Sequence, residues 1–453
     1  MDAGEVETLR AEVDALVREL AEERFRHVAG IEPVPSIEPL FRARSAAAHR
    51  KSAAALREAG QADLAAQVAA LRAERAAAAD EERWRAAESA ARADGPDGPL
   101  PLSAAEVRVL SEPDRERRRE FGRAAARAAA GAAAPRESAA ERRAAARAEA
   151  GLSPPWEDVV EADSLRDASD DAYREALAWA AGREETSARD LDRSDLRHLL
   201  ALRRYDGLFR PGRLLAELAR ALRGLGLDAA RARLDAADRP GKWPGARAFE
   251  GRVSFGRQGG AADWTALFAA AGAAVAAASS APAGRDPEFP GAIGALASSL
   301  LTIPRVLEGV LGVERRHVPD LLRSLALRRL FELRARAAAL RVAAESERGL
   351  SGAALRQAHR EALSSASLAA WPDGLAARDS DASALAASLQ GAALGEALRQ
   401  ELVERYDEDF YRNPRTPPAV AGLLAAGSAR LGKERPPLAV AAGALVRAIE
   451  RGG

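Results

Sequence analysis

Residues 258–279, QGGAADWTALFAAAGAAVAAAS, constrain the fold more than any other stretch of the sequence. Asp263 is a good helix N-cap, and a run of strong helix formers opens at Trp264. The preceding pair Gly259 and Gly260 indicates a strand end or tight turn where the backbone approaches another group closely. The sequence therefore predicts a helix over residues 263–279. Its apolar run is too short and too rich in alanine for a good membrane span.

The composition favours a large helical protein. The chain has 453 residues, of which 47% are hydrophobic and only 4% aromatic, and alanine, leucine, arginine and glutamate all favour helix. Basic and acidic residues number 67 each, so no net charge attracts nucleic acid or an anionic membrane. There is no cysteine, which excludes disulfides and thiolate chemistry. The N-terminus is unlike a secretory signal, and the alanine, arginine and glycine content is typical of a GC-rich bacterial genome. We expect a soluble, cytoplasmic protein.

The framework of the 258–279 segment resembles the metal helix of the HExxH zinc peptidases related to thimet oligopeptidase and oligoendopeptidase F. That helix commonly reads GG-x-x-D-[YW]-x-x-L-[FL]-H-E-x-G-H. The framework positions kept here are Gly259, Gly260, Asp263, Trp264, Leu267, Phe268 and Gly272. Residues 195–228 and 234–260 carry further similar steps, so the resemblance covers roughly residues 160–432.

The chemical positions of the motif are not kept. Ala269 and Ala273 stand where the two histidines would be, and Ala270 stands where the glutamate would be. In an active site the two histidines share one helix face and hold zinc, and the glutamate between them acts on the zinc-bound water. A methyl group has no lone pair, so this helix offers zinc no ligand.

Two later segments of the resemblance also lack the side chains that carry the family's chemistry. Ile293 takes the place of the glutamate that is the family's third zinc ligand, and an apolar residue there suits a dry, refilled site. Ala384 and Ser388 take the places of two tyrosines that would face the reacting carbonyl. We therefore expect no metal, no cofactor and no catalytic residue at these vestigial positions.

The resemblance implies a mainly α fold, with a large, multi-helix, two-lobed body around a central cleft. It divides the chain into an N-terminal helical region, residues 1–150, with long helices and a loop at 93–101, and a peptidase-like domain, residues 151–453, with the degenerate zinc-site helix 263–279. The alternating segment RVSF predicts a small β-sheet near residues 247–258. In the resembled enzymes a sheet edge holds extended substrate by main-chain bonds. The candidate peptide-binding residues are Ser254, Phe255, Gly259 and Gly260.

The leading hypothesis is a catalytically inactive peptidase homologue that binds peptides or an active paralogue. One alternative is a hydrolase with a relocated active site; the histidines at 27, 49, 198, 317 and 359 form no pair at helical spacing for such a site. A second alternative is a structural or interaction module. The arginine-rich helix within residues 103–150 is interpreted as a solvated face rather than a nucleic-acid patch, because no aromatic residues interleave with the arginines.

Overall fold

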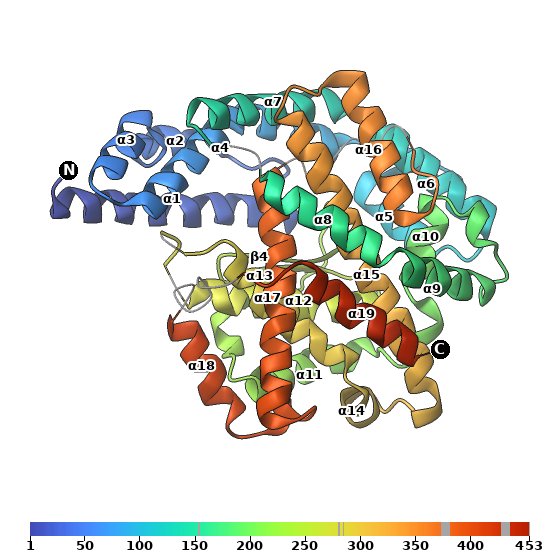
Figure 1. The fold of residues 1–453 in the computed structure, drawn as a ribbon. Coiled ribbons are helices and arrows are strands. Elements are labelled where there is room, and N and C mark those ends of the chain that lie inside the picture. Colours follow the sequence, from blue (N-terminus) through green and yellow to red (C-terminus); the bar gives the residue numbers. More distant parts are fainter. Residues whose placement is uncertain (153–154, 280, 284, 373–380, 427–434, 453) are drawn as a thin grey trace.

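The computed structural model describes the whole chain except residues 153–154, 280, 284, 373–380, 427–434 and 453. The described residues form a mainly helical protein with a small β-sheet, as the sequence predicts (Figure 1). The N-terminal region contributes α1 Ala3–Val28, α2 Glu38–Ala43, α3 Arg50–Glu58, α4 Ala62–Ala90, α5 Leu102–Ser111, α6 Arg115–Ala130 and α7 Ala133–Glu149.

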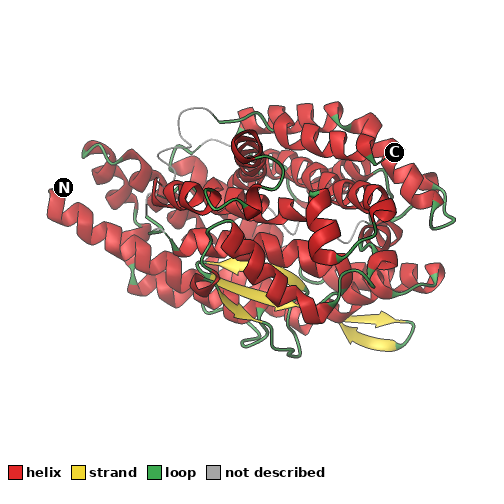
Figure 2. Cartoon of the chain, turned by 90° about the horizontal axis from the view of Figure 1, so that it is seen from below, coloured by secondary structure: helices red, strands yellow, loops and turns green. Residues whose placement is uncertain are grey.

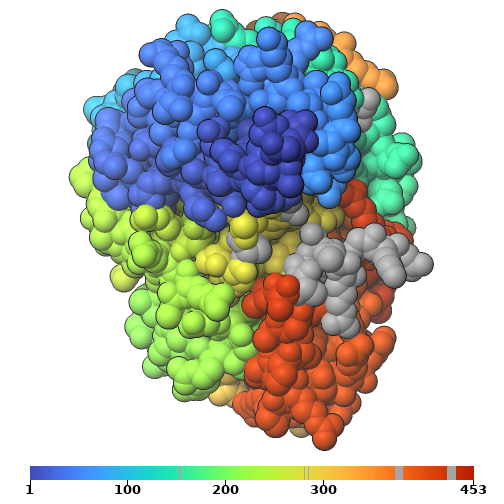
Figure 3. Space-filling model, turned by 90° about the vertical axis from the view of Figure 1, so that its left-hand side faces the viewer, coloured from blue at the N-terminus to red at the C-terminus, as the bar shows by residue number. Residues whose placement is uncertain are grey.

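The remaining helices begin just after the gap at 153–154, next to the expected domain boundary. They are α8 Trp156–Ala168, α9 Asp170–Gly182, α10 Arg193–Leu200, α11 Pro211–Gly224, α12 Gly260–Ala278, α13 Glu288–Ser299, α14 Pro304–Val306, α15 Val318–Ser346, α16 Gly352–Ser367, α17 Ala382–Tyr406, α18 Thr416–Ala426 and α19 Ala439–Arg451. In Figure 3 the N-terminal region (blue) covers one end of the molecule, above the segments drawn in green and yellow.

Two small sheets accompany the helices (Figure 2). The prediction of a plain loop at 93–101 is wrong, because β1 Arg92–Gly95 and β2 Gly98–Pro101 form an antiparallel hairpin there. The sheet predicted near 247–258 is present as three strands, β3 Arg233–Asp235, β4 Gly245–Phe249 and β5 Arg252–Gly256. Their order is β3-β5-β4, so β5 lies in the middle, parallel to β3 and antiparallel to β4.

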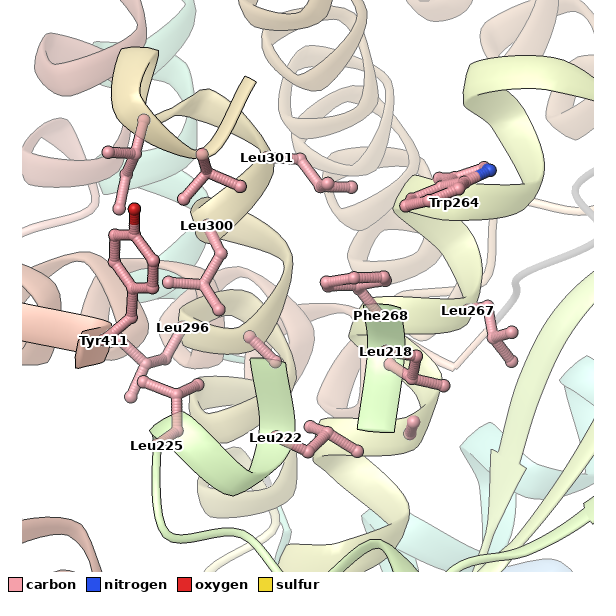
Figure 4. Packing of buried hydrophobic residues seen from close by; sticks show 14 of the residues in the cluster. Leu218, Leu222, Leu225, Trp264, Leu267, Phe268, Leu296, Leu300, Leu301 and Tyr411 are labelled. Atoms are coloured by element: carbon pink, nitrogen blue, oxygen red, sulfur yellow. The ribbon is translucent and has the colours of Figure 1, made fainter. Parts of the chain in front are cut away.

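The apolar helix α12 is the centre of the largest hydrophobic cluster (Figure 4). Trp264 stacks on Phe268 at a centroid distance of 6.0 Å and meets Phe209 edge-on at 5.9 Å. Among the described residues, α12 alone is long and apolar enough to cross a membrane as a single straight helix. However, 72% of its most apolar window is buried inside the protein, which is typical of a core helix.

Glycines let three helices of this core approach closely. A Cβ built on Gly272 of α12 would lie 2.8 Å from both the Ile293 carbonyl oxygen and the Ala297 Cβ of α13. A Cβ built on Gly395 of α17 would lie 2.5 Å from the Ala292 carbonyl oxygen, also of α13. Neither position has room for a side chain, so α12, α13 and α17 form one tightly packed layer.

The two long helices α15 and α17 connect the main cluster with a second one. The first turns of α15, including Leu321, belong to the cluster around α12, and later residues such as Leu340 pack with α8, α9 and α19. Along α17 the order is reversed, with Leu385 in the second cluster and Leu402 in the first. A cavity between α15 and α17 would therefore lie where the two hydrophobic clusters meet.

The sequence predicted that the arginine-rich helix α6 presents a solvated face. The structure shows instead that three of its arginines pair with a buried carboxylate. Arg115, Arg118 and Arg119 all donate to the carboxylate of Asp195 on α10, with N–O distances from 2.7 to 3.1 Å. Asp195 is buried, and although burial alone would raise the pKa of its carboxyl, the guanidinium groups of Arg119 and Arg115 hold that pKa below the usual range. These arginines tie α6 to α10.

Candidate functional site

A cavity with a volume of about 490 Å³ lies beside α12. This volume is within the range of about 300–1,000 Å³ that is common for ligand pockets. Its walls come from β4, α12, α13, α15, α17 and α19. One wall is built from methyl groups and glycines, and the facing helices α15 and α17 contribute arginines and glutamates.

The α12 wall contains the three alanines that the resemblance to the zinc peptidases singled out in the sequence. Ala269, Ala270 and Ala273 all line the cavity, together with Thr265 and Ala266. Residues at i, i+3, i+4 and i+7 or i+8 share one helix face, which explains why this set opens onto the same space. The alanines singled out in the sequence therefore lie on the side of α12 that faces the cavity.

Two other positions chosen from the sequence are not in the cavity wall. Ile293 is fully buried in the hydrophobic core, and the cavity face of α13 is formed by its neighbours Gly291, Gly294, Ala295 and Ser298. Ile293 therefore does not share the cavity wall with Ala269 and Ala273. Ala384 is exposed in the first turn of α17, where its N–H donates to Asp381, whereas Ser388, one turn later, does line the cavity.

The predicted peptide-binding residues also need correction. Ser254 and Phe255 are buried in β5, and β5 cannot offer an edge because β3 and β4 pair with its two sides. The strand that borders the cavity is β4, through Ala246 and Ala248. Within the described strands β4 pairs with β5 alone, so its other edge is the one available to an extended chain.

Gly259 and Gly260 have a structural role. Both have positive φ, at 95° and 58°. A Cβ built on Gly259 would lie 2.4 Å from Arg203 Nη1, and one built on Gly260 would lie 1.9 Å from Asp206 Oδ1. Asp263 is not the N-cap; it lies in the first turn, and its Oδ1 accepts a 2.7 Å bond from the Gln258 N–H. Burial raises the pKa of this carboxyl.

The charged wall of the cavity was missed by sequence reasoning. Arg328, Arg329, Glu332 and Arg336 come from α15, and Glu396 comes from α17. The α15 residues recur at the 3.6-residue period, which is a signal for a shared face but also the usual pattern of a solvated helix. Burial lowers the pKa of the Arg329 guanidinium, while the nearby Glu396 and Glu332 act in the opposite direction.

The residues around the cavity do not fit a zinc ion. Zinc sites in proteins use nitrogen, sulfur or carboxylate ligands. The α12 face offers alanine methyl groups, and the α13 face offers two glycines, an alanine and the Ser298 hydroxyl. The described part of the chain contains no group of three or more histidine, aspartate or glutamate side chains placed to hold a metal ion.

Comparison with known proteins shows which fold this chain shares. No protein-family model and no curated protein matches the sequence. Among solved structures, an oligoendopeptidase F superimposes with a TM-score of 0.56 at 13% identity, covering 95% of this chain and 85% of the other. An oligoendopeptidase F from Bacillus anthracis gives a TM-score of 0.53 at 14% identity, with coverage of 95% and 85%. At these identities the likeness confirms the expected oligoendopeptidase-type fold, and activity is a separate question.

Proposed function

We propose that this protein is a non-catalytic relative of the oligoendopeptidases that binds short peptides in the cavity beside α12. The observation that carries the proposal is the cavity itself. It is large enough for a ligand and bordered by β4, yet the α12 side presents Ala269, Ala270 and Ala273 in place of metal-binding and basic groups. Peptide binding needs the space and the strand edge, and peptide hydrolysis by a bound metal would also need the missing ligands.

The mode of binding follows from β4. An extended peptide can add to a free strand edge through main-chain hydrogen bonds, which require no particular side chain in the protein. Arg247 and Ala248 of β4 are exposed, and Ala246 and Ala248 line the cavity. A peptide on this edge would therefore lie along the cavity with side chains reaching toward α15 and α17.

A relocated hydrolase site has little support from the positions of the histidines. His27 contacts the Pro33 carbonyl at 3.0 Å and His198 contacts the Leu110 carbonyl at 3.1 Å. Burial is the main cause that lowers the pKa of each to about 4, so both are neutral at pH 7. Neither lines the cavity beside α12. Such packed, hydrogen-bonded histidines are typical of structural roles.

Two measurements test the proposed function. The purified protein is assayed for zinc content and for cleavage of a peptide library, and both are expected to be negative. Peptide binding is then measured by calorimetry with pools of unmodified pentapeptides, where measurable binding is expected. Stoichiometric zinc, chelator-sensitive cleavage, or the absence of binding by every pool would contradict the proposal.

A pair of variants locates the binding site. Ala269→Trp fills part of the cavity and is expected to abolish peptide binding without loss of the fold, because Ala269 opens onto empty space. Ala384→Trp is the matched control, since Ala384 is exposed and outside the cavity wall, and it is expected to bind peptide normally. Equal binding by both variants would place the peptide elsewhere.

A further inference from the structure

The charges on the cavity wall do not balance. The cavity is lined by Arg328, Arg329 and Arg336 of α15, and by the carboxylates of Glu332 and Glu396. Arg399, which is outside the wall, adds a fourth guanidinium close to Glu396. The cavity wall therefore holds three guanidinium groups and two carboxylates, and Arg399 pairs with one of these carboxylates from outside the wall.

Both carboxylates already have partners. Arg328 donates from Nε to Glu332 at 3.2 Å and from Nη1 to the Leu200 carbonyl at 3.0 Å. Glu396 accepts bonds of 2.6 and 2.9 Å from Arg399. With these pairs formed, the positive surplus falls on the two remaining cavity arginines.

Arg329 and Arg336 have no fixed partner in the part of the chain that the structure describes. Neither forms a hydrogen bond or an ion pair with a described residue, although Glu332 and Glu396 lie close enough to Arg329 to interact through space. Both side chains are half-buried. An arginine held out of water without hydrogen-bond acceptors is unfavourable, so these guanidinium groups remain available to an acceptor that enters the cavity.

The two arginines are placed to act together. They are seven residues apart on α15, which corresponds to about two helical turns and about 10 Å along the helix axis. Residues at this spacing lie on nearly the same helix face, and both line the same space. A guanidinium group offers planar, paired N–H donors that match the two oxygens of a carboxylate.

We propose that Arg329 and Arg336 recognise a carboxylate of the bound peptide, an inference that rests on the peptide-binding function proposed above. The peptide main chain lies along β4, and its carboxylate crosses the cavity to α15. The carboxylate comes either from the C-terminus of the peptide or from an acidic side chain. A neutral peptide satisfies only the β4 side of the site.

Three fluorescently labelled peptides, all based on one neutral pentapeptide, distinguish these two sources of the carboxylate when their binding is measured by fluorescence anisotropy. The first has a free C-terminus, the second is amidated, and the third is amidated and carries one glutamate. The free or the glutamate-bearing peptide is expected to bind about tenfold or more tightly than the neutral amide, because charge-assisted hydrogen bonds are the stronger kind. Which of the two gains affinity identifies the source of the carboxylate.

Arg329→Gln and Arg336→Gln are expected to remove this preference and leave the affinity for the neutral amide unchanged. The control is Arg316→Gln, because Arg316 is 74% exposed and pairs with Glu314 away from the cavity. The melting temperatures of the two cavity variants are expected to stay level or rise, since neither substitution removes a described partner.

The outcomes are distinguishable. If all three peptides bind equally, or if the preference survives both cavity substitutions, carboxylate recognition is refuted and the peptide-binding function stands. If Arg329→Gln lowers the melting temperature substantially, the arginine has a structural role and the inference is overturned. If no peptide binds at all, the proposed function itself fails and this inference with it.

Discussion

Glu288 offers a direct test of how the start of α13 is stabilised. Its side chain is buried, with 3% of the residue exposed, and its carboxylate pairs at 2.7 Å with Arg435, which is 59% exposed. Burial raises the pKa of Glu288 to about 7, the neighbouring Asp286 and Asp158 add to the increase, and Arg435 opposes it. The folded protein therefore binds this proton more tightly than the unfolded chain does.

The sign and size of the pH dependence follow from that difference. A carboxyl whose pKa is raised in the folded state destabilises the folded protein when it ionises. This loss of unfolding free energy is absent below pH 4.5, grows between pH 4.5 and 7, and is complete above pH 7. At about 1.4 kcal/mol for each tenfold change in proton affinity, the full cost is about 3 kcal/mol. Glu288→Gln, which stays neutral, is expected to be more stable than the wild type by up to about 3 kcal/mol at pH 8 and nearly equal to it at pH 4.

Urea unfolding of both proteins at pH 4, 5.5, 7 and 8 measures this difference. The pKa of His27 and of His198 is lowered, so each destabilises the folded state as pH falls, but both proteins carry them and their effect cancels in the comparison. Glu7→Gln is the control, because Glu7 is 71% exposed. A difference that does not change with pH, or a Glu288→Gln protein less stable at pH 8, would refute the reasoning.

Three further substitutions, two of them with a comparison variant, test the packing of α13 and α17 and the ion pairs of α6 with α10 by chemical unfolding. Gly395→Ala is expected to cost about 1–3 kcal/mol because its Cβ would lie 2.5 Å from the Ala292 carbonyl oxygen, whereas Gly422→Ala, a helical site with nothing within 4 Å, is expected to stabilise by about 0.5–1 kcal/mol. Ile293→Glu buries a carboxylate in the core and is expected to cost about 3–5 kcal/mol, and Ala269→Glu, which opens onto the cavity, much less. Asp195→Asn leaves the buried Arg118 without its carboxylate and is expected to cost about 3–5 kcal/mol. A loss below 1 kcal/mol for Ile293→Glu would mean that its side chain reaches water.

The sequence predicted the fold class and the central helix because those signals are local and strong. Residues from Trp264 onward favour helix at nearly every position, and α12 forms from Gly260 to Ala278, close to the predicted 263–279. The hairpin at residues 92–101 was missed because Gly and Pro were interpreted only as loop residues. Pro96 and Asp97 join the two short strands, and Gly98, the first residue of β2, adopts a positive φ. The Pro-Asp-Gly run was therefore a readable turn signal.

The sequence singled out cavity-lining residues on one helix and missed most of them on the others for a geometric reason. Adjacent helix residues point about 100° apart, so an error of one position moves a side chain from the cavity to the core. Ile293 and Gly294 show this directly, since the first is buried in the core and the second lines the cavity. On α12 the framework residues fixed the helix phase, whereas on α13 and α17 sparse motifs left it open. The order of strands in a sheet depends on pairing between segments that are distant in the sequence. The sequence alone therefore could not show whether β5 lies at the edge of the sheet or in its middle.

The charge of the cavity wall bears on the proposal that a peptide, and no metal ion, occupies the cavity. In an oligopeptidase-type zinc site a divalent cation would occupy the space beside α12, and negative or lone-pair donors would have to surround it. Here the α12 face is neutral and the α15 face carries two arginines that form no hydrogen bond or ion pair with a described carboxylate, so the local charge opposes a cation. Charge opposition and the missing ligands act in the same direction, although they arise on different helices. The same positive surplus favours a ligand that carries a carboxylate, which is the kind of peptide ligand proposed above.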